Sequence, residues 1–348
     1  MPPLLETRHA TKVFGGGGLR KAPGMIALDD LSYSIDADPP SITAVVGESG
    51  SGKTTLARML LGLVTPTRGE VLYRGKDLRR LSGEERKHFL REIQVIFQDP
   101  YEVYNPFYKV DHVLETPIQE FRLAPTRQQG RALMDEVLNA VGLRPEETLG
   151  RYPHQLSGGQ RQRIMVARAL LLRPRLIIAD EPVSMVDASL RATILESLRQ
   201  LHLRYAISLL YITHDLTTAY QISQHVLVMY RGDVVEAGDV QLVVQRPLHP
   251  YTQLLINSIP QADPGQPWQH HEMVADPATT PTTPAGAHSA CKFADRCPHV
   301  MDICRTTVPP LFRTDERRAA ACFLYRDSPA LESADLNSVL VTPVAAEV

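Results

Sequence analysis

The chain has 348 residues, with 37 Lys and Arg against 39 Asp and Glu, for a formal net charge of −2. This length predicts one large domain with an appendage. The near-neutral balance argues against a protein whose main partner is the nucleic-acid backbone, because binding through counterion release needs clustered excess Lys and Arg. No apolar run approaches the roughly 18 residues that cross a bilayer, and the N-terminus does not resemble an export signal. We therefore expect a protein that stays in the cytoplasm.

Short β-rich runs alternate with longer helical patterns over residues 1 to about 255, which predicts an α/β domain on a largely parallel sheet. Buried strands are expected at 41–46, 176–179, 207–212 and 225–229, and helices after residue 53 and at 127–141, 159–172 and 190–203. Pro, Thr and Ala then dominate residues 260–289, which indicates a linker. The last residues, 328–348, are expected to form a loose tail.

A glycine-rich loop follows the strand predicted at 41–46. It fits the pattern Gly, four residues, Gly-Lys-Ser/Thr, and consists of Gly47, Glu48, Ser49, Gly50, Ser51, Gly52, Lys53 and Thr54, with Thr55 next. Such a loop turns successive N–H groups toward phosphate oxygens, and the following helix adds its positive dipole end. Lys53 is predicted to approach the β and γ phosphates, and the Thr54 hydroxyl to ligate Mg²⁺. The pattern predicts nucleotide binding, with a flexible surface loop as the alternative.

The strand predicted at 176–179 ends in two consecutive carboxylates, Asp180 and Glu181. A buried strand delivers such groups to the edge of the sheet where open α/β folds bind ligands. Asp180 can hold Mg²⁺ directly or through water, and Glu181 can act as general base toward an attacking water. Solvated acids at a strand end are the alternative, which the neighbouring phosphate loop disfavours.

The segment at 156–160 resembles the signature sequence of the ATP-binding-cassette (ABC) ATPases; it reads Leu156, Ser157, Gly158, Gly159 and Gln160. In that family the motif order is phosphate loop, glutamine loop, signature, carboxylate strand, Asp loop and histidine, and Gln98, Asp187 and His214 occupy the remaining positions. The resemblance covers residues 5–255. It implies a P-loop NTPase fold with a RecA-like core, an antiparallel β subdomain and a helical signature subdomain, here followed by a small irregular Cys-rich extension.

The resemblance also implies roles for these residues. Phe14 would stack on adenine, although core packing is the alternative for an aromatic near a strand. Gln98 would contact Mg²⁺ or water and link to membrane subunits, and His214 would bond the γ-phosphate. Two cassettes pair head to tail in this family, so the signature residues would contact ATP bound to the partner, with Asp187 at the dimer interface. Three arginines after the signature are expected on exposed or intersubunit faces of one helix: Arg161, Arg163 and Arg168.

The C-terminal third resembles one subgroup of the family, the importers of dipeptides, oligopeptides and nickel. The stretch 246–252, Arg-Pro-Leu-His-Pro-Tyr-Thr, is typical of the end of their cassette, and their C-terminal region resembles the segment that holds Cys291, Cys297, Cys304 and Cys322. Clustered cysteines in a reducing cytoplasm favour metal ligands over disulfides. Their gaps of five, six and seventeen residues differ from the close pairs of structural zinc sites. Four Cys without His suit a [4Fe-4S] cluster, which the resemblance to this subgroup favours, with zinc or no metal as alternatives.

Together these resemblances imply an ABC ATP-binding domain at 1–258, a linker at 259–289, the Cys-rich region at 290–327 and the tail at 328–348. They imply an ATPase subunit of a prokaryotic peptide importer that uses ATP and Mg²⁺ on the cytoplasmic face of the inner membrane, as a peripheral protein. Its expected partners are two permeases, a second and commonly different cassette, and an extracytoplasmic substrate-binding protein, with no nucleic acid. The alternatives are import of nickel or another small solute, a soluble ABC ATPase acting on nucleic acid or ribosomes, and a non-catalytic cassette.

Overall fold

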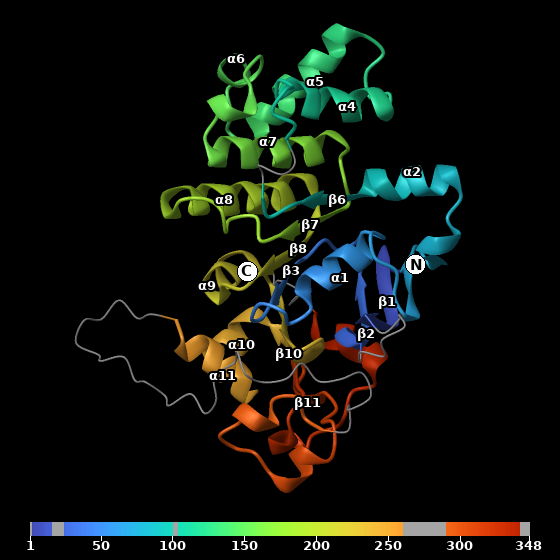
Figure 1. Ribbon diagram of the computed structural model, residues 1–348, viewed down its shortest axis with the longest axis vertical. Helices are drawn as coiled ribbons and strands as arrows, with labels where there is room; N and C mark the ends of the chain where they lie inside the picture. Colours follow the sequence, from blue (N-terminus) through green and yellow to red (C-terminus); the bar gives the residue numbers. More distant parts are fainter. Residues whose placement is uncertain (1, 16–23, 100–103, 260–289, 342–348) are drawn as a thin grey trace, which may run out of the picture. The chain divides into compact units, whose positions relative to one another are not determined.

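A computed structural model describes residues 2–15, 24–99, 104–259 and 290–341 (Figure 1). The linker expected at 260–289 lies outside these ranges. The chain forms two compact units. The first unit comprises Met1–Ile35, Thr43–Arg79 and Thr213–Val348, and the second comprises Asp36–Ile42 and Arg80–Ile212. Within the described ranges, no helix is long and apolar enough to cross a membrane.

The first unit contains an antiparallel sheet in the order β2-β1-β4-β5. Its strands are β1 (Leu5–Phe14), β2 (Met25–Ile35), β4 (Arg68–Tyr73) and β5 (Lys76–Asp77). Leu5 lies opposite both Ile35 and Tyr73, and its side chain is fully buried. The alternation of buried and exposed residues along β1 is typical of a sheet with one face against the core. This sheet matches the antiparallel subdomain expected from the sequence.

A second set of strands in the first unit has the order β11-β12-β10-β9-β3. These strands are β3 (Ile42–Val46), β9 (His225–Tyr230), β10 (Asp233–Asp239), β11 (Phe312–Asp315) and β12 (Arg318–Ala320). β3 and β9 pair in parallel and are buried along their whole length, as expected for strands covered on both faces. The associated helices are α1 (Lys53–Leu60), α9 (Leu216–Ile222), α10 (Val240–Gln245) and α11 (Pro250–Asn257).

The second unit contains three parallel strands in the order β8-β7-β6. They are β6 (Ile93–Ile96), β7 (Leu176–Asp180) and β8 (Ser208–Thr213). Its helices are α2 (Gly83–Glu92), α4 (Asp111–Glu120), α5 (Arg127–Ala140), α6 (Pro145–Thr148), α7 (Gly158–Leu171) and α8 (Ala188–Tyr205). Figure 1 shows α4 and α5 beside α7, which both of them contact. The strands and helices predicted from periodicity are confirmed to within about two residues.

The C-terminal extension is more regular than the sequence suggested. Its strands β11 and β12 continue the sheet of β10, with Glu236 opposite Ala320. The expectation of a loose tail from residue 328 is wrong as far as Val341. Residues Ser333–Val339 form a 3-10 helix whose Val339 side chain is fully buried. The Asn337 amide exchanges two hydrogen bonds with the main chain of Ser34 in β2, at 3.0 and 2.6 Å. The buried apolar side chain and the hydrogen bonds to β2 therefore order this segment, although its composition suggested an unstructured tail.

Candidate functional site

The phosphate loop lies between β3 and α1, as its pattern requires. Gly52 caps α1 with a φ of 108°, and a Cβ there would lie 2.4 Å from the carbonyl oxygen of Ala27. A Cβ on Gly47 would lie 2.2 Å from the carbonyl oxygen of Met229. Both distances are far below van der Waals contact with backbone atoms that have no room to move. The glycines are therefore required by the close approach of neighbouring main chain as well as by the curl of the loop.

Lys53 is held inside this curl. Its side chain is buried, and its Nζ donates to the carbonyl oxygens of Gly47 and Glu48 at 2.7 and 2.8 Å and to Ser51 Oγ at 3.3 Å. Ser49, Gly50 and Thr54 are exposed. The Lys53 ammonium thus provides the positive charge that a phosphate-binding loop needs, while part of the loop reaches the surface.

Two contacts on the phosphate loop were not predicted from the sequence. The backbone N–H of Glu48 donates to the Tyr251 hydroxyl at 2.8 Å. The Arg296 guanidinium makes a bidentate ion pair with the Glu48 carboxylate, with both distances 3.0 Å. Tyr251 and Arg296 lie 203 and 248 residues from Glu48 along the chain. Their residue types carry no local indication of this contact.

Tyr251 is positioned by a buried acid in β10. The Glu236 carboxylate accepts the N–H groups of Leu248 and His249 at 3.0 and 2.9 Å, which pins the start of α11. Burial raises the pKa of Glu236 to about 7. His249 Nδ1 accepts the N–H of Tyr251 at 3.0 Å and so caps α11, and burial lowers the pKa of this imidazole to about 4. Both groups favour their neutral forms because the interior disfavours charge.

The second unit brings the predicted glutamine and glutamate together. Gln98 Nε2 donates to Glu181 Oε2 at 2.9 Å. Asp180 ends β7 and is half-buried, and the turn that follows places Glu181 at a φ of 46°. Its N–H donates to the carbonyl of Ile212 at 2.9 Å, and Ser184 donates to its carbonyl through both N–H and Oγ. A non-glycine residue in this backbone region costs about 1 kcal/mol or more and is typical of functional sites.

The signature segment forms the N-terminus of α7. Ser157 Oγ accepts the N–H of Gln160 at 3.2 Å, and Gln160 Oε1 accepts the N–H of Ser157 at 2.9 Å. This capping box occupies both side chains. The N–H groups of Gly158 and Gly159 belong to the first turn, where a helix offers no carbonyl acceptor. The geometry therefore fits the anion site expected there.

The Asp loop precedes α8. Asp187 is exposed, and its carbonyl accepts the N–H groups of Leu190 and Arg191. The two residues before Asp187 differ in exposure: Met185 is exposed and Val186 is buried. Only the Met185 side chain is therefore presented at the surface of this unit.

Phe14 and His214 belong to the first unit, together with the phosphate loop. Phe14 ends β1 with 40% of its surface exposed and Lys12 Nζ 5.1 Å from its ring centroid, so it is not a core residue. His214 is exposed between β8 and α9. The other predicted residues, Gln98, the signature, Asp180, Glu181 and Asp187, belong to the second unit.

The expectation that Arg161, Arg163 and Arg168 lie on exposed or intersubunit faces of α7 is wrong for Arg161, and the other two are half-buried. Only 9% of Arg161 is exposed. Arg168 donates to the carbonyl of Val95 at 2.9 Å, and burial lowers its pKa. Tyr104 donates its hydroxyl to the Arg161 carbonyl at 2.8 Å. α7 is packed on several sides, so its periodicity did not indicate which face meets solvent.

The four cysteines gather in the C-terminal extension as free thiols: Cys291, Cys297, Cys304 and Cys322. Cys304 packs against Phe312 and Phe323, and its carbonyl accepts the N–H of Cys291 at 2.9 Å. Burial raises the pKa of three thiols, that of Cys322 to about 11, so thiolates are disfavoured. Across the described ranges, no group of three or more His, Cys, Asp or Glu is placed to hold a metal ion. The predicted [4Fe-4S] cluster, and zinc in its place, therefore lack structural support.

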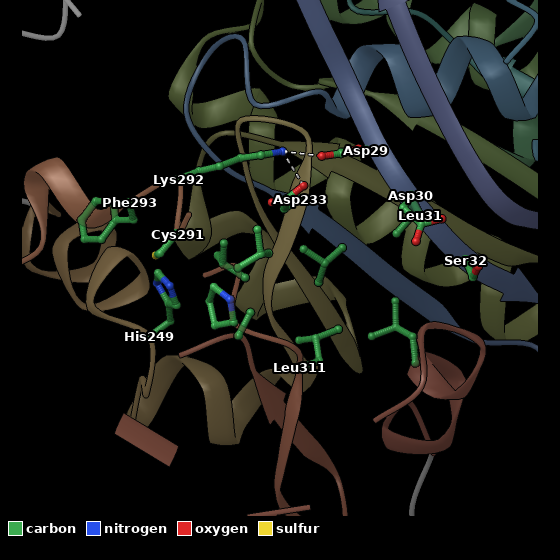
Figure 2. Close-up of a pocket in the computed structure, with 16 residues that line it drawn as sticks. Asp29, Asp30, Leu31, Ser32, Asp233, His249, Cys291, Lys292, Phe293 and Leu311 are labelled. Atoms are coloured by element: carbon green, nitrogen blue, oxygen red, sulfur yellow. Dashed lines mark hydrogen bonds and ion pairs between the residues drawn. The ribbon is translucent and has the colours of Figure 1, made fainter. Parts of the chain in front are cut away.

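A cavity of about 270 Å³ lies between the extension and strands β2 and β10 of the same unit. Figure 2 shows Lys292 reaching from the extension toward Asp29 and Asp233, which it contacts at 3.1 and 2.6 Å. Only 8% of the Lys292 side chain is exposed. Burial raises the pKa of Asp233 to about 6, against the lowering effect of Lys292. Lys292 thus anchors the extension to β2 and β10 through two ion pairs.

Comparison with known proteins places these features in a family. The ABC transporter family matches residues 28–184, and the oligopeptide/dipeptide transporter C-terminal region matches residues 235–304. The putative oligopeptide transport ATP-binding protein YkfD of Bacillus subtilis is 39% identical over 330 residues, covering 95% of this chain and 98% of that protein. The chain belongs to the ABC transporter ATP-binding family. The oligopeptide transport ATP-binding protein AppF of the same organism is 36% identical over 92% of this cassette chain.

Solved structures support the same cassette fold. The ATP-binding cassette MJ0796, a dimer bound to ADP and Pi in a post-hydrolysis state, is 26% identical with a TM-score of 0.59 and covers 68% of this chain and 98% of that one. CbiO1 from Clostridium perfringens, part of the ABC transporter complex cbiONQ, has the same TM-score of 0.59 at 23% identity, covering 71% and 92%. The predicted ABC cassette fold is confirmed. The chain is accordingly an ABC ATPase.

Proposed function

We propose that this ABC ATPase is the ATP-hydrolysing subunit of an importer for dipeptides or oligopeptides and drives transport through membrane permeases. The C-terminal region carries the substrate part of the proposal, because it matches the oligopeptide/dipeptide transporter region and two relatives are named for oligopeptide transport. The hydrogen bond between Gln98 and Glu181 carries the catalytic part, because it places the candidate base beside the glutamine loop.

The phosphate loop and Phe14 would bind ATP, with Lys53 charge-paired to the phosphates. Mg²⁺ would be held by Thr54, Gln98 and Asp180, whose hydroxyl, amide and carboxylate oxygens suit a hard cation, and would neutralise charge on the phosphates. Glu181 would accept a proton from the attacking water, and His214 would bond the γ-phosphate. The 2.9 Å contact from Gln98 supports this arrangement because it holds the Glu181 carboxylate in one orientation.

The partners follow from the same proposal. Two cassettes would pair head to tail, with Ser157, Gly158, Gly159 and Gln160 closing on ATP bound to the partner and Asp187 at the interface. The partner cassette would be a different chain. The pair would sit on the cytoplasmic face of the inner membrane against two permeases, which receive solute from an extracytoplasmic binding protein. The cassette would end near residue 258, followed by a linker and the Cys-rich region.

Three variants test the catalytic assignment. Glu181→Gln should bind MgATP with the wild-type affinity, while phosphate release falls by about two orders of magnitude or more because the general base is lost. Lys53→Ala should weaken MgATP binding more than about tenfold. The matched control is Glu196→Gln, which neutralises an exposed acid of α8 and should hydrolyse ATP normally. Wild-type turnover by Glu181→Gln would refute the assignment.

Uptake distinguishes the solutes. Cells that express the chain with its chromosomal partners are given a labelled dipeptide or tripeptide, or radioactive nickel. Peptide accumulation that is abolished by Glu181→Gln supports the proposal. Accumulation of nickel alone would contradict it, and co-purification with ribosomes instead of permeases would point to a soluble ABC ATPase.

Metal binding by the cysteines remains a prediction with a direct test. Iron, acid-labile sulfide and zinc are measured in anaerobically purified protein. About four irons and four sulfides per chain would support the [4Fe-4S] cluster. Absence of all three elements would agree with the structure, in which no three cysteines of the described residues are placed to hold a metal ion.

A further inference from the structure

The C-terminal extension reaches the phosphate loop through one side chain. Arg296, in the 3-10 turn Ala294–Arg296, pairs with Glu48 through two parallel hydrogen bonds of 3.0 Å. The Arg296 side chain is only 15% exposed and that of Glu48 is 39% exposed. The hydrogen bonds to Glu48 raise the pKa of Arg296, which remains charged. Bidentate pairs of this kind define geometry as well as charge.

Arg296 itself is held rigidly. Its guanidinium lies 5.9 Å from the ring centroid of Tyr230 and 5.6 Å from that of Phe293. These rings and that of Tyr251 pack on one another with centroids 4.6 to 5.6 Å apart. Lys292 anchors the same turn to Asp29 and Asp233 (Figure 2). The packed aromatic rings therefore hold the guanidinium in position beside the phosphate loop.

Glu48 connects Arg296 to the phosphate-binding lysine. Its carboxylate binds Arg296 and its N–H binds the Tyr251 hydroxyl, while its carbonyl accepts Lys53 Nζ at 2.8 Å. The same carbonyl accepts the N–H of Ser51 at 3.1 Å. Each hydrogen-bonding group of Glu48 thus has a partner, and two of these partners come from beyond residue 250. The position of the Lys53 ammonium depends on where this residue is held.

The negative charge of Glu48 gives its ion pair with Arg296 a second effect, on the binding of ATP. A carboxylate on a phosphate-binding loop repels the phosphates of ATP, and this repulsion acts over several ångströms. Arg296 neutralises this carboxylate, and without Arg296 the cation available to it within the loop would be Lys53. A released Glu48 would both repel the nucleotide and compete for the lysine.

We propose that Arg296 is a positioning residue for the ATP site, so that the Cys-rich extension completes the nucleotide pocket of its own chain by neutralising and orienting Glu48. This inference rests on the proposed function of the phosphate loop in binding ATP. It gives the extension a task in nucleotide binding that requires no metal.

Equilibrium titration of the purified full chain with MgATP tests the proposal. Arg296→Ala should raise the dissociation constant about three- to tenfold, with kcat changed less than about twofold, because the loop loses orientation and gains an unpaired charge. Arg296→Lys, which retains charge but loses the fork, should recover part of the affinity. Arg317→Ala is the matched control, because it breaks another ion pair from the extension, 2.7 Å to Asp239, away from the loop. It should leave the dissociation constant unchanged.

A double-mutant cycle removes general effects on folding. Glu48→Ala probes the same pair from the loop, and Arg296→Ala combined with Glu48→Ala should bind MgATP no more weakly than the weaker single variant. Additive losses, an Arg296→Ala constant within about 1.5-fold of wild type, or an equal loss in Arg317→Ala would overturn the proposal. Lys53→Ala distinguishes failure of the Arg296 proposal from failure of the proposed ATP-binding function. If wild type binds MgATP and Lys53→Ala does not, the proposed function stands whatever Arg296 shows; if wild type fails to bind, both fall.

Discussion

Removal of one buried oxygen gives the sharpest test of how the phosphate loop is supported. Tyr251→Phe deletes the hydroxyl that accepts the Glu48 N–H at 2.8 Å and keeps the ring, which is fully buried against Tyr230 and Phe293. The apolar area buried on folding is nearly unchanged. The cost is therefore that of leaving one backbone donor without its partner, about 1–3 kcal/mol.

This cost predicts two observables. For a cooperative unit of about 150–250 residues, a loss of 1 kcal/mol lowers Tm by about 2–4 °C, so Tyr251→Phe should melt about 2–12 °C below wild type in calorimetry without nucleotide. The affinity for MgATP should fall as well, because the freed N–H lies in the loop that binds the phosphates. Both effects arise from the same missing hydrogen bond.

Tyr325→Phe is the matched control. It also deletes one hydroxyl, which donates to the carbonyl of Leu248 at 3.0 Å, but this contact does not touch the phosphate loop. We expect a lower Tm with unchanged MgATP affinity. The reasoning is refuted if Tyr251→Phe matches wild type in both Tm and affinity, or if Tyr325→Phe lowers affinity by the same factor.

Three further changes test separate features. Gly52→Ala should destabilise the chain by more than about 1 kcal/mol, read from denaturant unfolding, because its Cβ would lie 2.4 Å from the Ala27 carbonyl. His249→Asn keeps an acceptor that can cap α11 but has no group that titrates in this range. Burial lowers the pKa of His249 from 6.5 to about 4. As pH falls from 6.5 to 4, the free energy of unfolding of the wild type should therefore decrease by up to about 3 kcal/mol more than that of the variant. Lys292→Met removes the cation that pairs with Asp233. Since burial already raises the pKa of Asp233 to about 6, the loss of stability should be larger at pH 8 than at pH 5, measured by urea unfolding; an equal loss at both pH values would contradict the pairing.

Local sequence patterns predicted the secondary structure around the site well because each element depends mainly on residues close together in the chain. A buried run followed by glycines and Lys53 requires a strand, a tight loop and a helix, and the structure has all three in that order. The order of motifs also singled out Gln98 and Glu181, whose side chains meet at 2.9 Å, and their roles stay predictions. Periodicity was a poor guide where a helix is packed on several sides, as the buried Arg161 of α7 shows.

The sequence alone determined the family, the phosphate loop and the positions of the acid, amide and histidine side chains, since each depends on neighbours a few residues away or on motif order. Tertiary structure decided what supports the loop. Tyr251 and Arg296 approach Glu48 from more than 200 residues away, at 2.8 and 3.0 Å. Such contacts depend on how β10, α11 and the extension pack, and no spacing within the chain encodes them. The same packing orders the segment up to Val341 and buries Cys304 and Cys322, while Cys291 and Cys297 stay partly exposed.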